Sequence, residues 1–152
     1  MTTVTEQPRE TRGTRRGWAG TGLLVVLLVV AANALYGGVG LMVNGLGMPE
    51  EWLEPLPVDT WAWPGVALLL TVAVPQLAAA WLVWRRHPWG PAAGLLAGAG
   101  LVLWIAVQLV LLQRYFFLQP VIAGLGLVEV LLAWAWLRQL RGGLAPGKVG
   151  AR

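Results

Sequence analysis

The chain has 152 residues, of which 57% are hydrophobic and only 12% are charged, and its formal net charge is +4. Soluble domains carry roughly 25% charged residues, so this composition excludes an ordinary soluble fold and predicts an integral membrane protein surrounded by lipid. Cysteine and serine are absent, and histidine and aspartate occur once each, at His87 and Asp59. These gaps exclude serine and cysteine nucleophiles, histidine metal clusters and aspartate pairs.

The N-terminal part of the chain combines a polar stretch with the first apolar segment. Residues 1–16 contain four arginines, and we expect them to form a disordered cytoplasmic tail. Residues 17–43 are long enough to span a membrane with some tilt. An apolar run at 23–31 followed by A-x-A at 32–34 is also typical of a signal peptide. Because the apolar stretch continues through Val43, we expect the segment to remain in place as a helix.

The next stretch, 44–63, contains all four acids between the first two apolar segments and has no lysine or arginine. Two interpretations are open. Pro49 followed by Glu50 and Glu51 is a pattern that starts short interfacial helices, with acids near the positive end. The alternative is an acidic loop interrupted by prolines.

Three further apolar segments cover 64–84, 91–113 and 121–137. At about 1.5 Å of rise per residue, each has a length suited to crossing the hydrocarbon layer. Short connections make neighbouring helices antiparallel. The sequence therefore predicts an all-α, four-pass transmembrane helix bundle in up-down-up-down order over 17–137. The basic residues 138–152 are expected to form a C-terminal tail.

The distribution of cations predicts the orientation. The N-terminal tail, the Arg85-Arg86 connection and the C-terminal tail hold every lysine and arginine except Arg114. In a four-pass arrangement these three segments lie on one side, which the positive-inside rule assigns to the cytoplasm. We expect a multi-pass plasma-membrane protein with both termini cytoplasmic, in contact with lipid and not with nucleic acid.

Small residues mark the faces on which helices pack. Gly90, Gly94 and Gly98 recur every four residues, and Gly126 and Ala133 flank Glu129 on the last segment. Close backbone approach at such residues drives helix association in membranes. The stripe suits a contact inside the bundle or between copies of the chain, and both interpretations are open.

Glu129 is the one ionisable residue at the middle of an apolar segment. A carboxyl group in hydrocarbon is costly unless something satisfies it. No lysine or arginine lies in the hydrocarbon region to pair with it. We therefore expect Glu129 to be protonated and to hydrogen-bond an amide, either Gln108 or Gln76.

Each of the other three segments carries an amide on a face that we expect to turn inward. Asn33 is accompanied by Tyr36, and Gln108 by Trp104 one turn away, while Gln76 follows Pro75. By helical spacing, the sequence predicts that these faces converge in a polar pocket that opens outward, with Glu129 near its floor.

No phosphate loop, metal-ligand set or nucleophile–base pair is visible, so we expect neither an enzyme nor a cofactor. Two functions remain open. One is an accessory, scaffolding or partner-binding subunit, associated with further copies or with another membrane protein. The other is a small proton-coupled transporter, or a binder of an amphipathic or cationic molecule, that uses Glu129.

Overall fold

The computed structural model describes residues 17–112, 115 and 117–142. This part of the chain is all-helical and contains no strand. Four of its helical segments are long and apolar enough to cross a membrane, which confirms the predicted helical class and the predicted number of membrane-length segments. The expected tail at 1–16, residues 143–152 of the expected C-terminal tail, and Arg114 lie outside the described residues.

Three of the four segments are continuous helices: α1 (Trp18–Asn44), α4 (Gly90–Leu112) and α5 (Leu118–Gly142). The second apolar segment consists of α2 (Ala62–Leu68), a π-helical turn η3 (Leu69–Ala73) and α3 (Val74–Trp84). Between α1 and α2 lie two short 3₁₀ turns, η1 (Gly45–Gly47) and η2 (Glu50–Leu53). The acidic stretch thus holds a short 3₁₀ turn directly after Pro49, in addition to the turn η1 that follows α1.

The π-helical turn has a local cause. Pro75 has no backbone N–H, and its ring clashes with the carbonyl group four residues earlier, at Thr71. The wider turn accommodates that clash, and the Thr71 hydroxyl donates to the Ala67 carbonyl at 2.6 Å. Val72, Ala73 and Gln76 are buried on either side of Pro75, so the segment still presents one continuous face to the bundle.

Helix α5 is longer than the predicted 121–137 and includes the first residues of the expected C-terminal tail. The guanidinium group of Arg138 lies 3.7 Å from the ring centroid of Trp134, in a cation–π contact. Arg141 lies in the last turn, where the negative end of the helix dipole favours a cation. These two interactions explain why the basic residues prolong the helix.

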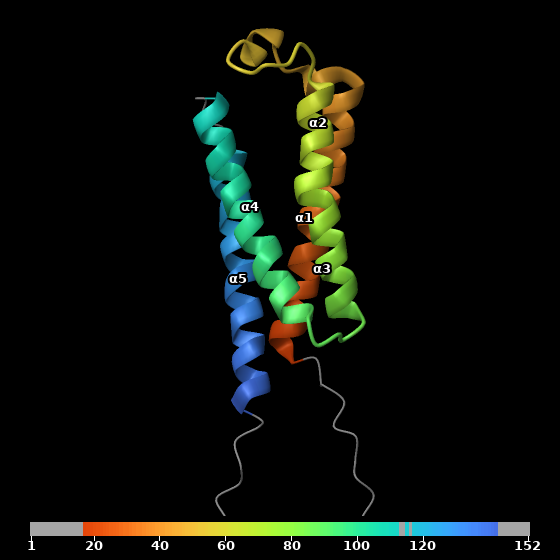
Figure 1. The fold of residues 1–152 in the computed structure, drawn as a ribbon, viewed down its shortest axis with the longest axis vertical. Helices are drawn as coiled ribbons and strands as arrows, with labels where there is room; N and C mark the ends of the chain where they lie inside the picture. The colour runs from red at the N-terminus through yellow and green to blue at the C-terminus, as the bar shows by residue number, and fades with distance from the viewer. Residues whose placement is uncertain (1–16, 113–114, 116, 143–152) are drawn as a thin grey trace, which may run out of the picture.

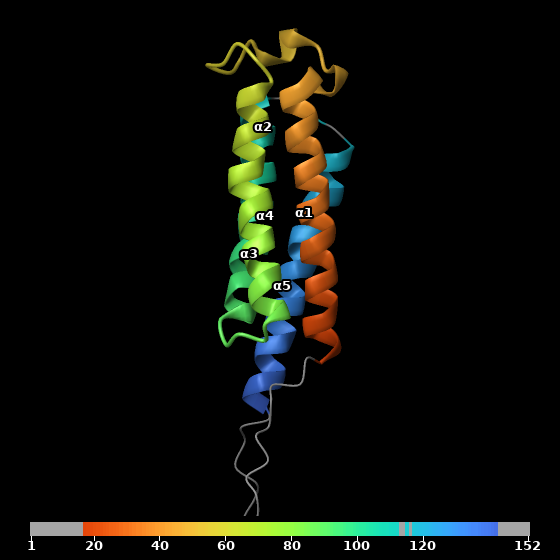
Figure 2. The same ribbon diagram turned by 90° about the vertical axis from the view of Figure 1, so that its right-hand side faces the viewer.

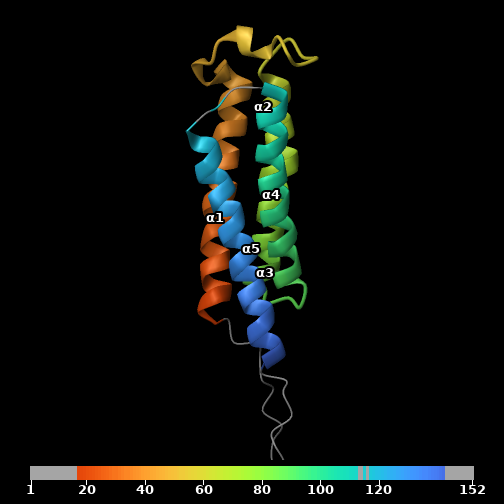
Figure 3. The same ribbon diagram turned by 90° about the vertical axis from the view of Figure 1, so that its left-hand side faces the viewer.

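The bundle has two chemically different ends (Figure 1). The start of α1, the α3–α4 connection and the end of α5 lie at the "arginine end", with Arg85, Arg86, Arg138 and Arg141. The α1–α2 connection crosses the opposite "acidic end", which carries Glu50, Glu51, Glu54 and Asp59. Helices α1 and α2 run side by side up to this connection (Figure 2), and α4 and α5 run alongside each other (Figure 3).

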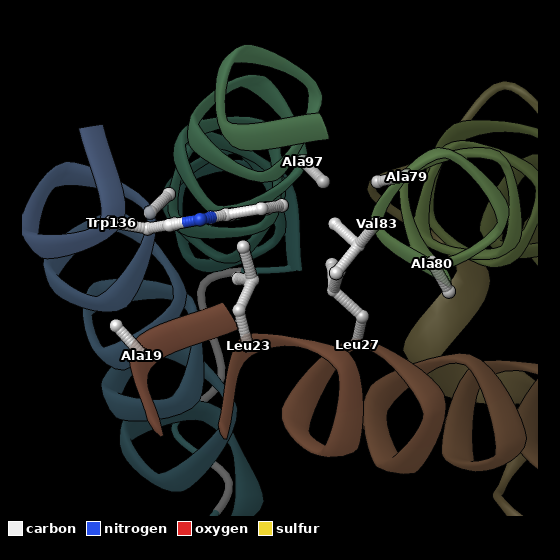
Figure 4. Packing of buried hydrophobic residues seen from close by; sticks show 9 residues of the cluster. Ala19, Leu23, Leu27, Ala79, Ala80, Val83, Ala97 and Trp136 are labelled. Carbon is white, nitrogen blue, oxygen red and sulfur yellow. The ribbon is translucent and has the colours of Figure 1, made fainter. Parts of the chain in front are cut away.

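One of two clusters of buried hydrophobic residues lies toward the arginine end. Leu23 and Leu27 of α1, Val83 of α3 and Trp136 of α5 are at most 2% exposed. Figure 4 shows the Trp136 ring beside Leu23 and the Val83 side chain beside Leu27, with Ala97 and Ala79 pointing toward each other; Ala80 belongs to the same cluster. Large side chains thus fit between alanines, which gives the close van der Waals contact on which membrane helices depend.

Candidate functional site

The buried acid predicted from the sequence forms the centre of the bundle. Glu129 of α5 is 0% exposed and Gln76 of α3 is 1% exposed. The Gln76 Nε2 group donates to Glu129 Oε2 at 2.9 Å. Of the two amides expected to pair with Glu129, the structure brings Gln76 to it. This bond joins two helices that are separated by more than fifty residues in sequence.

The same pair has two oxygens without partners. Glu129 Oε1 and Gln76 Oε1 are buried and make no hydrogen bond. Both are acceptors when the carboxyl is ionised, so neither satisfies the other in that state. Protonation of Glu129 adds an O–H donor to the pair. A carboxylic acid and an amide each have a donor and an acceptor, so the two groups then match. Hydrogen-bond accounting thus supports a neutral Glu129.

Helix α4 closes the site through a glycine. A Cβ atom at Gly98 would lie 2.7 Å from the Gly126 carbonyl oxygen and 2.8 Å from Glu129 Cβ. A Cβ atom at Gly126 would lie 2.9 Å from the Gly98 carbonyl oxygen. The backbones of α4 and α5 therefore touch beside the carboxyl, which leaves no room for a ligand or water on that side.

The other predicted packing residues lie along the same α4–α5 contact. A Cβ atom at Gly94 would lie 2.7 Å from a Leu23 methyl group and 3.4 Å from Ala133 Cβ, and one at Gly90 would lie 3.3 Å from the Trp136 ring. Ala133 is 0% exposed. The glycine stripe thus faces the interior of this chain, and of the two interpretations the structure shows the intramolecular contact.

A cavity of about 560 Å³ lies at the acidic end, separate from Glu129. Its walls come from α1, α2, α4 and the start of α5, and the α1–α2 connection contributes the side chains of Met48, Trp52 and Leu56. Neither Glu129 nor Gln76 lines it. The prediction of a polar pocket with Glu129 at its floor is therefore wrong, because the tight α4–α5 contact encloses the carboxyl.

The cavity lining is mainly aliphatic and aromatic, with a few polar groups. The predicted residues Trp104 and Gln108 both line it, and Gln119 of α5 is a further amide in its wall. Trp61, which is only 8% exposed, also lines it. The Nε1 atoms of Trp61 and Trp104 are buried and have no hydrogen-bond partner. The Trp136 Nε1 atom in the closed core is likewise buried and without a partner, so these N–H groups are shielded within the packed helices and are not exposed to the cavity.

The predicted inner face of the first segment points the other way. Asn33 is exposed, and Tyr36 is 74% exposed. Helix α1 instead buries the face that carries Leu23, Leu27 and Ala34. The prediction that Asn33 and Tyr36 face the pocket is wrong, because large aliphatic side chains pack against the alanines of α3 and α5 better than a polar face would.

Two features of the site were missed from the sequence. A Cβ atom at Gly65 of α2 would lie 2.6 Å from the Gly38 carbonyl oxygen of α1, so these helices touch backbone to backbone. The ring of Trp61 lies against Gly45, where a Cβ would be 2.8 Å from Trp61 Cδ1. In the sequence, the Gly37-Gly38 pair is the feature that could have indicated the contact between α1 and α2.

Comparison with protein-family models, with curated proteins and with solved structures finds no match. The function has therefore to be argued from the geometry of this chain alone.

Proposed function

We propose that the protein is a non-enzymatic scaffolding protein of the plasma membrane that assembles with a second copy through the exposed face of α1. Its four helices cross the bilayer in up-down-up-down order with the arginine end in the cytoplasm, as the positive-inside rule requires for Arg85, Arg86, Arg138 and Arg141. This places the acidic end and its cavity outside.

The observation that carries the proposal is the exposed amide of Asn33. It lies near the middle of α1, and no hydrogen bond joins its side chain to another described residue. Hydrocarbon offers an amide no partner, so such a side chain favours contact with a polar group of another helix.

A second copy of α1 supplies a matching group. An amide is both a donor and an acceptor, so Asn33 is complementary to itself across a two-fold axis. The small residue Ala32 and the phenol of Tyr36 are exposed on the same side of the helix, so Ala32 permits close approach and Tyr36 adds a further hydroxyl to the contact.

The absence of cysteine from the chain makes the proposal directly testable. A single Tyr36→Cys substitution is expected to give a disulfide-linked dimer on mild oxidation in membranes. Leu103→Cys on α4 is the matched control, because Leu103 is similarly exposed at 65%. Adding Asn33→Leu to Tyr36→Cys is expected to reduce cross-linking several-fold. Equal cross-linking at both positions, or a monomer throughout, would contradict the proposal.

A small proton-coupled carrier is the second candidate, and one observation favours it. The two partnerless oxygens of the Glu129–Gln76 pair adjoin the π-helical turn η3, and such turns often mark functional positions. In proteoliposomes, Glu129→Gln would abolish proton-coupled flux by a carrier. A scaffold would retain both its stability and its cross-linked dimer in the same variant.

A further inference from the structure

The cavity at the acidic end arises from the way the helices are paired. Helix α2 is held against α1 through Gly65 and Gly38, while α4 is held against α5 through Gly98 and Gly126. The two pairs separate toward this end (Figure 1). Toward the arginine end the pairs come together, since η3 and α3 pack against α4. The cavity of about 560 Å³ is therefore closed on that side and bordered by α2 and α4.

The wall of the cavity continues onto the outer surface of the helices. Trp63 of α2 and both Val107 and Leu111 of α4 line the cavity and are also exposed. All three lie in segments that are long and apolar enough to cross a membrane. The α1–α2 connection crosses the end of the bundle and adds Met48 and Trp52 to the lining. In a bilayer the cavity therefore opens sideways, to the hydrocarbon of the leaflet at the acidic end.

The composition of the lining makes water a poor filling. Apart from Gln108 and Gln119, every described residue of the lining is aliphatic, aromatic, methionine or proline. A volume of about 560 Å³ would take on the order of 20 water molecules at about 30 Å³ each, and a buried water needs two to four polar partners. Two amides supply few of the hydrogen bonds that such a cluster requires, so the cavity favours an apolar occupant.

The shape of the bundle disfavours a protein segment as that occupant. An α-helix is about 10–12 Å wide, so a space of about 560 Å³ holds roughly one helical turn. The described chain begins with α1 and ends with α5 at the arginine end (Figure 1). Residues 1–16 and 143–152 therefore join the bundle at the end opposite to the cavity. A hydrocarbon chain is narrow and flexible, and the surrounding bilayer supplies it at the open side.

We propose that the cavity holds one acyl chain of a phospholipid from the leaflet at the acidic end, which enters between α2 and α4. The chain gives the lining side chains the dispersion contacts that an unfilled space denies them. The proposal rests on insertion of the bundle in a bilayer, which is part of the proposed function, but not on assembly through α1. The Asn33→Leu variant is therefore expected to hold the chain normally.

A phosphatidylcholine that carries a diazirine in the middle of one acyl chain is a suitable probe. The full-length protein is illuminated in phosphatidylcholine nanodiscs, and the labelled residues are identified by mass spectrometry. Labelling is expected at Leu68 and Ile122, which are half-buried and line the cavity. Leu103 is the reference for ordinary lipid contact, because it is exposed on α4 and does not line the cavity.

Two substitutions at one position of the wall test occupancy. Ala67 lines the cavity, so Ala67→Trp fills part of it and is expected to lower labelling of Leu68 and Ile122 several-fold without changing that of Leu103. Ala67→Leu adds a smaller side chain and is expected to give an intermediate decrease, which provides the test if the tryptophan variant does not fold. Ala106→Trp is the matched control, because Ala106 is exposed on α4 and outside the cavity.

The outcomes separate the acyl-chain proposal from the proposed function. Unchanged labelling of Leu68 and Ile122 in both Ala67 variants, with Leu103 labelled, would overturn the acyl-chain proposal alone. An equal decrease in Ala106→Trp would also overturn it, because that change does not fill the cavity. If neither the cavity residues nor Leu103 are labelled, the bundle is not inserted in the bilayer, and the proposed function fails as well.

Discussion

The two ends of this bundle differ in how their tryptophans are surrounded. Toward the arginine end, Trp136 is 2% exposed and fits among leucines and alanines from three other helices. Toward the acidic end, Trp61 and Trp104 border a cavity of about 560 Å³. The position of the glycines explains why one tryptophan is enclosed and the others border a cavity. Close contacts at Gly90, Gly94 and Gly98 hold α4 against α5 and α1. At the acidic end, the close contact at Gly65 holds α2 against α1 instead. Close packing at one place therefore creates space at another.

The largest loss of stability is expected when a bulky side chain is removed from the arginine end. Trp136→Ala leaves a cavity among buried side chains, and we expect the free energy of unfolding to fall by about 4 kcal/mol. Trp63→Ala at the acidic end is the matched control, because Trp63 is 64% exposed, and we expect a loss below about 1 kcal/mol. Unfolding of both variants in mixed micelles measures the comparison. Similar losses would show that the two ends are packed alike.

The next prediction concerns the glycine beside Glu129. Gly98→Val places a branched side chain against the Gly126 carbonyl and forces α4 and α5 apart, and we expect a loss of about 3 kcal/mol. Gly100→Val introduces the same residue two positions away, where a Cβ meets no atom within 4 Å. It is expected to change stability by less than about 0.5 kcal/mol. Thermal unfolding in detergent distinguishes the two variants, and an equal effect would contradict the close α4–α5 contact.

The Glu129–Gln76 hydrogen bond joins α5 to α3 near the middle of the bundle. Its removal is expected to have an intermediate effect on the free energy of unfolding. Glu129→Leu leaves the Gln76 amide buried without a partner, which costs about 2 kcal/mol. Glu129→Gln preserves size and hydrogen bonding and is expected to cost less than about 1 kcal/mol. The measurement is again the free energy of unfolding. If the glutamine variant is as unstable as the leucine variant, the carboxyl provides something beyond a neutral hydrogen bond.

The smallest change in stability is expected at the acidic end. Trp61→Phe removes a buried N–H that has no acceptor, so we expect stability within about 0.5 kcal/mol of the starting protein. Thermal unfolding in detergent measures the change. A marked loss of stability would indicate that the indole N–H has a structural partner.

Parts of the candidate site were predictable because they depend on local chemistry. Glu129 stands out as an acid in an apolar segment, and the four-residue spacing of Gly90, Gly94 and Gly98 indicates a contact face. Gln76 was one of two expected partners for Glu129. Trp104 and Gln108 were expected beside Glu129, but the structure places them in a cavity that Glu129 does not line. Helical spacing predicts which residues share one face of a helix, but not toward which neighbouring helix that face turns.

Other parts were not predictable from one sequence. Asn33 and Tyr36 form a polar face that in a soluble protein would point away from a core. The same face was assigned to the interior here, because lipid was expected to be on the outside. The structure buries Leu23, Leu27 and Ala34 instead. The length of α5 also depended on a contact between side chains, that of Arg138 over Trp134.

The sequence by itself determined that the described chain forms four apolar helices of membrane-spanning length and that one carboxyl group lies in the middle of the last one. Run length, proline and glycine positions and charge distribution are local properties, and they suffice for that. Only the tertiary structure decided which face of each helix is inside. Lipid is as apolar as leucine, so hydrophobicity does not separate the buried face from the exposed one, and shape complementarity between side chains makes the choice.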